Sequence, residues 1–242
     1  MKFNLKIYMR LFLSCFLFLS FFNGYSQDKE FSIDTLHVRM DSLYREDQFY
    51  FGIIYNSLIN KPEGVSQDKI SAGFSLGFLR DMPINKKRTF AIAPGIGLAY
   101  NSFFQNLAIS GTNQVAVYAP IPNKDDYSRN KFEQFFVEVP IEFRWRSSTP
   151  ESYKFWRIYG GVKFSYLLFD KSVHVDDQTK TIIKNNKDFN NLLYGAFLSA
   201  GYNSINFYVY YGLNNLFQSS AKINNEPIKM NSLSLGVMFY IL

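Results

Sequence analysis

The residue types that most often carry out catalysis are scarce in this chain of 242 residues. It has two histidines, His37 and His174, and a single cysteine, Cys15. A nucleophilic hydrolase needs a nucleophile, a histidine and an orienting acid within hydrogen-bond reach of one another. His37 precedes the first predicted strand and His174 lies in a long predicted loop, so neither is placed beside such a pair. We therefore predict a protein without enzyme activity.

The loop sequence His174-Val175-Asp176-Asp177 contains three groups that can coordinate a metal ion. One imidazole and two carboxylates close together in a loop are a weak metal signal, and a solvated loop is the preferred explanation. Gly95-Ile96-Gly97 and Gly160-Gly161 do not match phosphate-binding loops, because both lie inside predicted strands and neither opens a helix. The sequence thus predicts no cofactor and no bound metal.

Residues 1–26 have the pattern of a secretory signal peptide. Three basic residues precede an apolar run over 11–22, which is shorter than the ~20 residues of a spanning helix. We expect cleavage after Ser26, which would leave residues 27–47 as a polar periplasmic lead-in segment. Cleavage removes Cys15 and lowers the net charge from +6 to +3 (23 Lys and Arg minus 20 Asp and Glu). Without a thiol or a basic block, the mature chain is not expected to form disulfides or to bind nucleic acid.

Apolar side chains alternate with polar or small ones in eight segments after residue 47, and this period of two predicts β-strands. The segments are 48–58, 69–80, 89–103, 133–147, 154–169, 191–203, 205–217 and 229–242. The connections between them are alternately long and short, with the longest at 104–132 and 170–190. Short turns at one end and long loops at the other are typical of outer-membrane barrels. We therefore predict an all-β fold, an eight-stranded antiparallel transmembrane β-barrel over 48–242, with both termini in the periplasm.

A soluble barrel would place lysine and glutamate on its polar face, whereas here that face carries small residues. These are Ser71, Gly73, Ser75 and Gly77 in the second segment, and Ala91, Ala93, Gly95, Gly97 and Ala99 in the third. Small side chains suit the crowded interior of an eight-stranded barrel. The opposite faces are rich in Phe, Leu and Ile and suit hydrocarbon. The last strand is uncharged and ends in Phe239-Tyr240-Ile241-Leu242, which resembles the C-terminal signal of outer-membrane barrels.

The stretch EQFFVEVPIEFRWR, residues 133–146, separates its side chains most clearly. Its odd positions from Phe135 to Trp145 are apolar and are predicted to face lipid, while its charged even positions face the lumen. Pro140 cannot donate to the strand ladder, so we expect a bulge or bend there. Trp145 and Trp156 fall on apolar faces beside one short turn. We predict that both form an aromatic girdle at the periplasmic interface.

The hairpin after that stretch is predicted to turn at Thr149-Pro150-Glu151-Ser152, with Pro150 in the second position of a type I turn. The predicted cross-strand pairs are Trp145–Trp156, Arg144–Arg157 and Glu138–Lys163. Unpaired charges in a narrow lumen are costly, whereas paired ones are tolerated. We therefore predict that charged side chains close the lumen, which excludes a conduit for a folded protein. The predicted network is Glu138, Glu142, Arg144, Arg157 and Lys163.

A series of short motifs over residues 50–106 resembles the PorT family of Bacteroidetes outer-membrane β-barrel proteins. The motifs are Tyr55-Asn56, Lys61-Pro62-Glu63-Gly64, Gly73-Phe74, Gly77-Phe78, Arg80-Asp81-Met82-Pro83-Ile84-Asn85-Lys86, Tyr100-Asn101-Ser102 and Gln105-Asn106. Tyr25-Ser26-Gln27 at the end of the signal and the richness in Phe, Asn and Lys suit the same phylum. Beyond residue 106 the resemblance is one of strand layout and length.

The resemblance implies a non-enzymatic component of the type IX protein secretion system, which exports sorting-domain proteins and, in gliding relatives, motility adhesins. The implied partners are outer-membrane lipid and other secretion-system proteins. The first short turn, Arg80, Asp81, Met82, Pro83, Ile84 and Asn85, is then a candidate periplasmic docking turn, although turn chemistry alone also explains its residues. Two alternative functions remain open. One is a small structural barrel or porin of the OmpX kind, and the other is a surface adhesin that uses loops 104–132 and 170–190.

Overall fold

The computed structural model describes residues 47–67, 69–147 and 156–241. The predicted signal peptide, nearly all of the lead-in segment and the predicted turn at 149–152 lie outside the described residues. Among the described residues, no helix is long and apolar enough to cross a membrane.

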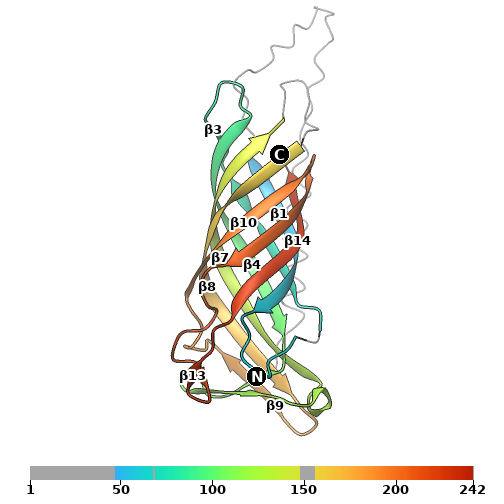
Figure 1. Cartoon of the computed structure of the whole chain (residues 1–242), viewed down its shortest axis with the longest axis vertical. Helices are drawn as coiled ribbons and strands as arrows, with labels where there is room; N and C mark the ends of the chain where they lie inside the picture. The colour runs from blue at the N-terminus through green and yellow to red at the C-terminus, as the bar shows by residue number, and fades with distance from the viewer. Residues whose placement is uncertain (1–46, 68, 148–155, 242) are drawn as a thin grey trace, which may run out of the picture. The chain divides into compact units, whose positions relative to one another are not determined.

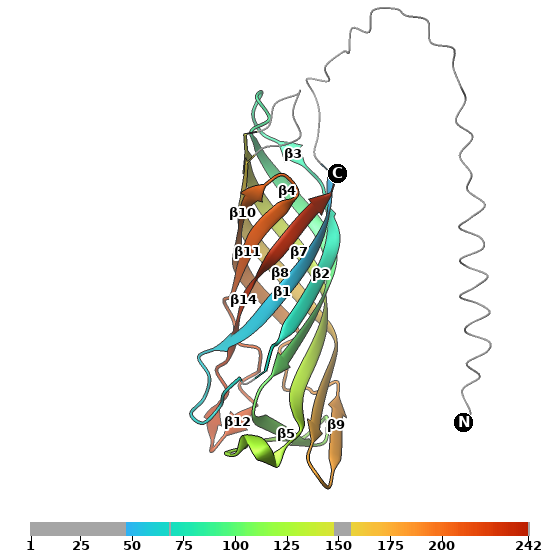
Figure 2. The same ribbon diagram turned by 90° about the vertical axis from the view of Figure 1, so that its right-hand side faces the viewer.

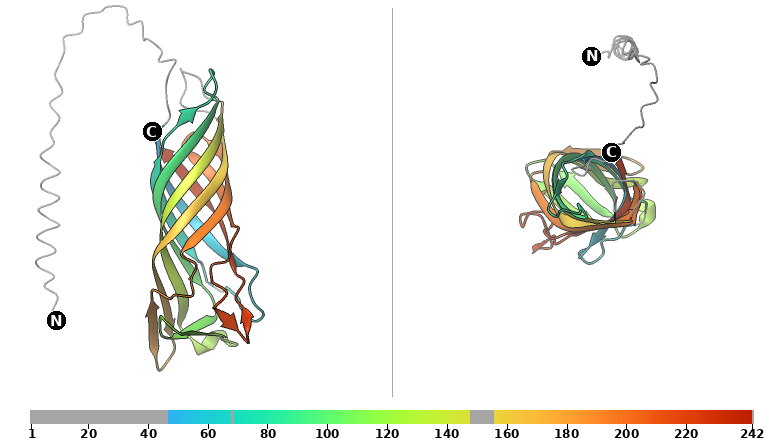
Figure 3. Two further views of the ribbon diagram at one scale, coloured as in Figure 1. Left: turned by 90° about the vertical axis from the view of Figure 1, so that its left-hand side faces the viewer. Right: turned by 90° about the horizontal axis from the view of Figure 1, so that it is seen from above.

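Eight long antiparallel strands close into a single barrel, as the sequence predicted (Figures 1 and 3). They are β1 (Gln48–Ile59), β2 (Ala72–Leu79), β4 (Phe90–Phe104), β7 (Arg129–Arg146), β8 (Trp156–Val175), β10 (Leu192–Tyr202), β11 (Ile205–Gly212) and β14 (Asn231–Ile241). Each pairs with its neighbour along the chain, and β1 pairs with β14 from Phe49–Ile241 to Ile59–Asn231. Because the first and last long strands pair along their length, the barrel has no open edge within its wall.

The connections alternate in length between the two ends of the barrel. One end, called here the short-turn end, carries the β2–β4, β7–β8 and β10–β11 connections and the end of β14 (Figure 1). The opposite, long-loop end carries the hairpin of β5 (Leu107–Gly111) with β6 (Ala116–Pro120), and the hairpin of β12 (Lys222–Ile223) with β13 (Glu226–Pro227). The β8–β9 hairpin, in which β9 spans Lys180–Lys184, lies there too (Figure 2).

The long loops contain more regular structure than the sequence analysis expected. The interval 104–132 includes β5, β6 and the short 3-10 helix η1 (Lys124–Asp126), and β7 already begins at Arg129. Within 170–190, β8 continues to Val175 and turns back as β9. The outward face of these extensions carries the charged residues Arg129, Lys131 and Lys171 beside Val173 and Val175. The continuous apolar face therefore ends there, although the ladders continue. Strand β11 is shorter than predicted, because it ends at Gly212, five residues before the predicted end at residue 217.

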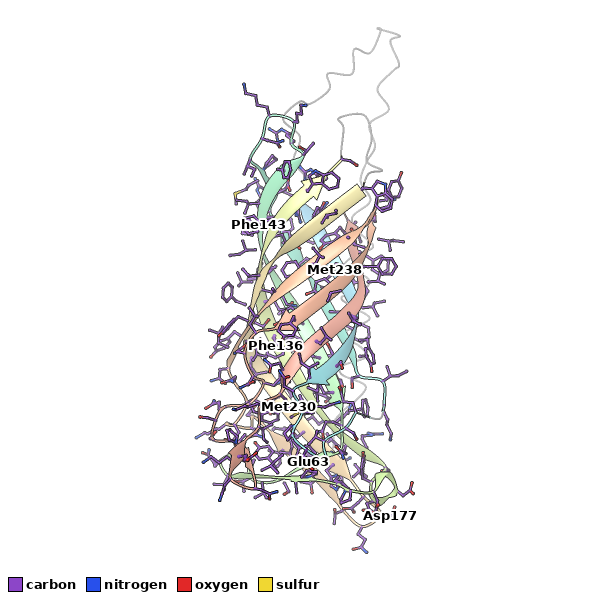
Figure 4. The ribbon with its side chains drawn as sticks, viewed as in Figure 1. Glu63, Phe136, Phe143, Asp177, Met230 and Met238 are labelled. Atoms are coloured by element: carbon purple, nitrogen blue, oxygen red, sulfur yellow. The ribbon has the colours of Figure 1, made fainter. Side chains whose placement is uncertain are left out.

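Outward side chains of the eight strands form an apolar belt around the barrel. The exposed members include Phe49, Ile53, Phe74, Leu76, Ile96, Leu98, Phe143, Ile158, Phe164, Leu198, Phe207, Val209 and Leu235. Figure 4 shows one of them, Phe143, pointing away from the barrel. The alternate positions point inward, and Ala91, Ala93 and Ala99 are buried there as predicted. The belt explains how the barrel contacts outer-membrane lipid.

The register of the β7–β8 hairpin differs by two residues from the predicted one. The observed pairs are Trp145–Ile158, Arg144–Tyr159 and Glu138–Ser165, in place of the predicted Trp145–Trp156, Arg144–Arg157 and Glu138–Lys163. The Ser147 N–H donates to the Trp156 carbonyl over 3.1 Å, so the connection beyond this bond is longer than a four-residue turn. A shift of two residues leaves the side chains from Phe136 to Trp145 on their predicted faces.

Of the bulge or bend predicted at Pro140, the structure contradicts the bulge. The irregularity in the β7–β8 ladder lies between Phe135 and Phe136, while Pro140 pairs in register with Lys163. On its other side, the β4–β7 ladder passes from Pro94–Ile141 to Gly97–Glu138 without a change in register. Pro140 falls in that interval. The missing N–H is thus accommodated by a local interruption of one ladder, and the strand needs no extra residue there.

Candidate functional site: the closed lumen and the hairpin at its short-turn end

Aromatic and aliphatic side chains fill the lumen in the half nearest the long loops. This apolar plug consists of Leu58, Phe103, Leu107, Phe132, Phe136, Phe189, Leu216, Phe217 and Met230, all buried. Ring centroids lie 4.9 Å apart for Phe103 and Phe132, and 4.6 Å apart for Phe189 and Phe217. Figure 4 marks Phe136 and Met230 in this half of the barrel and Met238 nearer the short-turn end. Ring contacts at these distances are typical of a packed protein core.

A buried ion pair occupies the middle of the lumen. Lys163 Nζ lies 2.8 Å from Glu138 Oε1, and Ser165 Oγ donates to the same oxygen over 3.3 Å. The ammonium group also lies over the rings of Tyr210, at 4.6 Å, and Tyr208, at 5.7 Å. Because Ser165 is the residue directly opposite Glu138, the lysine reaches its partner along the diagonal. The structure thus brings Glu138 and Lys163 together, though by a different register from the predicted one.

A larger charge cluster closes the lumen at the short-turn end. Asp81 Oδ1 accepts hydrogen bonds of 3.0 Å from Arg144 Nη1 and from Arg146 Nη1, and its Oδ2 accepts one of 2.9 Å from Arg146 Nη2. Arg144 Nε lies 2.9 Å from Glu142 Oε2, and the Tyr240 hydroxyl donates to Glu142 Oε1 over 3.2 Å. The side chains of Asp81 and both arginines are fully buried. We call Asp81, Glu142, Arg144 and Arg146 the ion-pair cluster.

Two residues of the ion-pair cluster lie outside the predicted network. The sequence predicts Asp81 in the candidate periplasmic docking turn, whereas the structure turns its carboxylate into the lumen. Arg146 was assigned to the lumen face but was given no partner. A signal was present in the sequence, because two arginines on one lumen face require a counter-ion and the adjacent short turn contains an aspartate. Arg157, which was predicted to oppose Arg144, is buried in the lumen directly opposite Arg146.

The β2–β4 connection forms a rigid hairpin that projects from the short-turn end. Arg146 holds both of its legs: its guanidinium binds Asp81 in the first, and its Nε donates to the Arg88 carbonyl in the second over 2.9 Å. The strand β3 (Met82–Pro83) pairs with β4 between the legs. Asn85 closes the tip, because its Oδ1 accepts the Phe90 N–H over 3.0 Å. The segment 81–89 is called the short-turn hairpin below.

The exposed surface of the short-turn hairpin is apolar and basic. Met82 and Ile84 are 47% and 65% exposed, and Lys86 and Lys87 are exposed beside them. Of the other proposed docking residues, Arg80 pairs with Asp47 over 2.7 Å, while Pro83 and Asn85 are partly buried. Asp81 is excluded from the contact surface by its burial.

Trp145 and Trp156 both point outward near the short-turn end, with 38% and 61% of their surfaces exposed. Trp145 pairs with Phe90 on β4, and Trp156 packs edge-on against Tyr202 with ring centroids 5.6 Å apart. The two tryptophans therefore lie on the lipid-facing side of the strands. Their depth in the bilayer remains a prediction.

The group His174, Asp176 and Asp177 shows local hydrogen bonding. His174 Nε2 lies 3.5 Å from Asp176 Oδ2, and Asp176 accepts hydrogen bonds from the Thr179 hydroxyl and from the Gln178 N–H. These bonds, first the one from Thr179, lower the pKa of Asp176 from its ordinary value. Among the described residues, no cluster of three or more His, Cys, Asp or Glu side chains could hold a metal ion. The carboxylate of Asp176 serves the turn between β8 and β9.

A family model and several solved structures match this chain. No curated protein matches it. The solved structures include two of Ail, the attachment invasion locus protein of Yersinia pestis, and one of these contains the heparin analogue sucrose octasulfate. Their identities are 14% and 13% and their TM-scores 0.39 and 0.35; each comparison covers 82% of this chain and 100% of the other. The family model described as outer membrane protein beta-barrel domain matches residues 8–218. The chain therefore belongs to the outer-membrane β-barrel domain family.

Proposed function

We propose that this protein is a non-enzymatic component of the type IX secretion system that anchors a docking surface in the outer membrane. It is needed there for the export of sorting-domain proteins and, where they exist, gliding adhesins. The resemblance of residues 50–106 to the PorT family supports the choice of system. The filled lumen is the observation that supports a docking role, because the plug and the ion-pair cluster leave no path for a cargo protein.

The short-turn hairpin is the proposed docking element. In the proposed orientation both termini and the short turns are periplasmic, so the hairpin projects towards partners in the periplasm. The bonds from Arg146 to Asp81 and Arg88 fix its legs before a partner arrives, which reduces the entropy lost on binding. The exposed Ile84 and Lys86–Lys87 suit a protein partner with an apolar contact bordered by acidic side chains.

Export by a strain that lacks the gene tests the function. We expect sorting-domain proteins to remain in the periplasm, and normal secretion would contradict the assignment. The docking element is tested by a strain that carries Ile84→Ser, Lys86→Glu and Lys87→Glu. Its matched control carries Lys222→Glu and Lys229→Glu at the long-loop end, where both lysines are exposed. We expect export to fail only in the first strain while both barrels insert normally. Normal export in the first strain would show that the hairpin is only a turn.

A porin of similar size is the competing function, and conductance separates the two. Purified barrel in a planar bilayer should give no stable channel, since both halves of the lumen are occupied by buried side chains. A steady ohmic conductance would contradict the docking role. The conductance measurement is independent of the secretion assay. A failure of the closed-lumen prediction can therefore be distinguished from a failure of the proposed role in secretion.

A further inference from the structure

Strand β9 has one backbone edge that pairs with β8 and another that faces away from it. The Asp176 N–H donates to the Thr179 carbonyl (3.1 Å), and the Asn185 N–H donates to the Asp170 carbonyl (3.2 Å). Bonded pairs alternate along an antiparallel ladder, so the Thr181 and Ile183 backbone groups point to β8. The N–H and C=O groups of the residues between them point the other way. These are Lys180, Ile182 and Lys184. Among the described strands, none pairs with this outer edge.

An open groove of about 520 Å³ runs beside the outer edge of β9. It is lined by Gly111, Thr112 and Asn113 at the tip of the β5–β6 hairpin, and by Ile182–Lys184 on β9. Figure 2 shows β5 and β9 together at the long-loop end. The Lys187 N–H donates to the Asn113 carbonyl over 3.2 Å and ties the two walls together. A sheet edge beside a groove is the arrangement in which proteins add a strand from a partner.

The groove is held open by rigid neighbours. Ile183, the inward residue of β9, is buried in the apolar core of the long-loop end. On the opposite wall, the Tyr118 hydroxyl of β6 donates to Asp188 over 2.8 Å and accepts from Asn186 over 2.9 Å. Burial of this ring raises the pKa of Tyr118, so the hydroxyl stays protonated and keeps donating at neutral pH. The walls are thus fixed from both sides.

We propose that this edge binds an extended segment of a partner protein by strand addition, and that the segment is acidic. The exposed side chains along the edge are Lys180, Ile182 and Lys184, with Ile182 43% exposed. Residues directly opposed in a sheet share a face and interact, and opposite charges there are favourable. The edge therefore selects a segment with an acidic residue, an apolar residue and an acidic residue at alternate positions.

A second copy of this chain does not fit the same edge. Antiparallel self-pairing centred on Ile182 would place Lys180 of each copy opposite Lys184 of the other. Lysines on edge strands commonly keep copies of a protein from pairing in this way. That protective role explains the two lysines but does not explain the groove or the exposed isoleucine between them. The geometry therefore favours a different chain as the occupant.

Peptide binding to the barrel in lipid nanodiscs tests the proposal. The probe is fluorescent Ser-Glu-Thr-Val-Thr-Glu-Ser, and its counterpart has lysine in place of both glutamates. We expect the acidic peptide to bind roughly tenfold more tightly than its lysine counterpart, because the counterpart replaces two attractive cross-strand charge pairs with repulsive ones. Lys180→Glu with Lys184→Glu should reverse this preference. The matched control, Lys222→Glu with Lys229→Glu, should retain it.

Amide hydrogen exchange identifies the edge itself. Bound acidic peptide should slow exchange at Lys180, Ile182 and Lys184 and leave Thr181 and Ile183, already bonded to β8, unchanged. Ile182→Pro removes an outward donor without breaking a bond to β8, so it should weaken binding while the barrel stays folded. Equal binding of the two peptides, no binding of the acidic one, or protection elsewhere would overturn the proposal.

Discussion

Replacing Asp81 with asparagine tests whether the ion-pair cluster stabilises the barrel. The substitution keeps the shape of the side chain and removes the charge that two arginines share. Three hydrogen bonds of 2.9–3.0 Å reach the carboxylate, and the side chains of Asp81, Arg144 and Arg146 are all 0% exposed. Breaking a buried ion pair by removing one partner costs about 3–5 kcal/mol. We expect a loss of that size in the free energy of unfolding of the Asp81→Asn barrel.

The matched control is Arg80→Ala, one residue earlier in the chain. Arg80 also forms an ion pair, at 2.7 Å from Asp47, but its side chain is 53% exposed. An exposed pair contributes ~0–1 kcal/mol, because water solvates both ions and salt screens them. Comparing the stability losses of Asp81→Asn and Arg80→Ala therefore shows how much of the effect depends on burial of the ion pair.

Urea unfolding of the barrel in lipid vesicles, followed by tryptophan fluorescence, gives the free energies. A loss below about 1 kcal/mol for Asp81→Asn, or equal losses for it and Arg80→Ala, would refute the reasoning. The double variant Asp81→Asn with Arg146→Met should recover part of the loss, since it also removes one of the charges left behind. No recovery would show that the cost comes from something other than the stranded charge.

Three further predictions concern packing, register and pH. Gly97→Ala should lower stability by about 1–3 kcal/mol, because the added methyl group would lie 2.0 Å from the Tyr50 hydroxyl; unfolding unchanged from the natural protein would contradict this. Cysteines at Val139 and Phe164 should crosslink faster than cysteines at Val139 and Val162, and the reverse order would restore the predicted register. Because the pKa of Asp176 is lowered, its carboxylate stabilises the β8–β9 turn fully at pH values above the ordinary pKa of 3.8. This stabilisation is lost as the pH falls through the lowered pKa. The protection of turn amides, taken relative to their intrinsic exchange rates, should fall over that acidic range, but not in Asp176→Ala.

The strand pattern was predictable because lipid imposes it. A strand that crosses hydrocarbon must place apolar side chains at every second position, as β1 and β7 do, so the face of each residue follows from its parity. Strand ends were less predictable. Beyond the bilayer, β7 and β8 face water on the outside, so Lys131 and Lys171 replace apolar residues although the hydrogen-bonded ladder continues. The hydrophobic signal measures contact with lipid, not the length of the strand.

The lumen charges were predictable as a set but not as pairs. Parity places Glu138, Arg144 and Lys163 inside in any register that differs by two residues. Which ions meet depends on the length of the β7–β8 connection and on long side chains that reach along diagonals. Asp81 was missed for a related reason, since position in a turn does not say whether a side chain points outward or back into the barrel.

The apolar plug and the ion-pair cluster both close the lumen, and this limits how the barrel could act. A path through the lumen would require the apolar plug to be displaced and the ion-pair cluster to open. Separating a buried pair such as Arg146 and Asp81 costs about 3–5 kcal/mol, which corresponds to an open population between about 10⁻² and 10⁻⁴ for that step alone. The plug adds the cost of exposing stacked rings such as Phe132 and Phe189 to water. The same bonds that keep the lumen shut also hold the short-turn hairpin, because Arg146 belongs to both. Opening the lumen would therefore release the proposed docking element, so the proposed docking role requires a closed lumen.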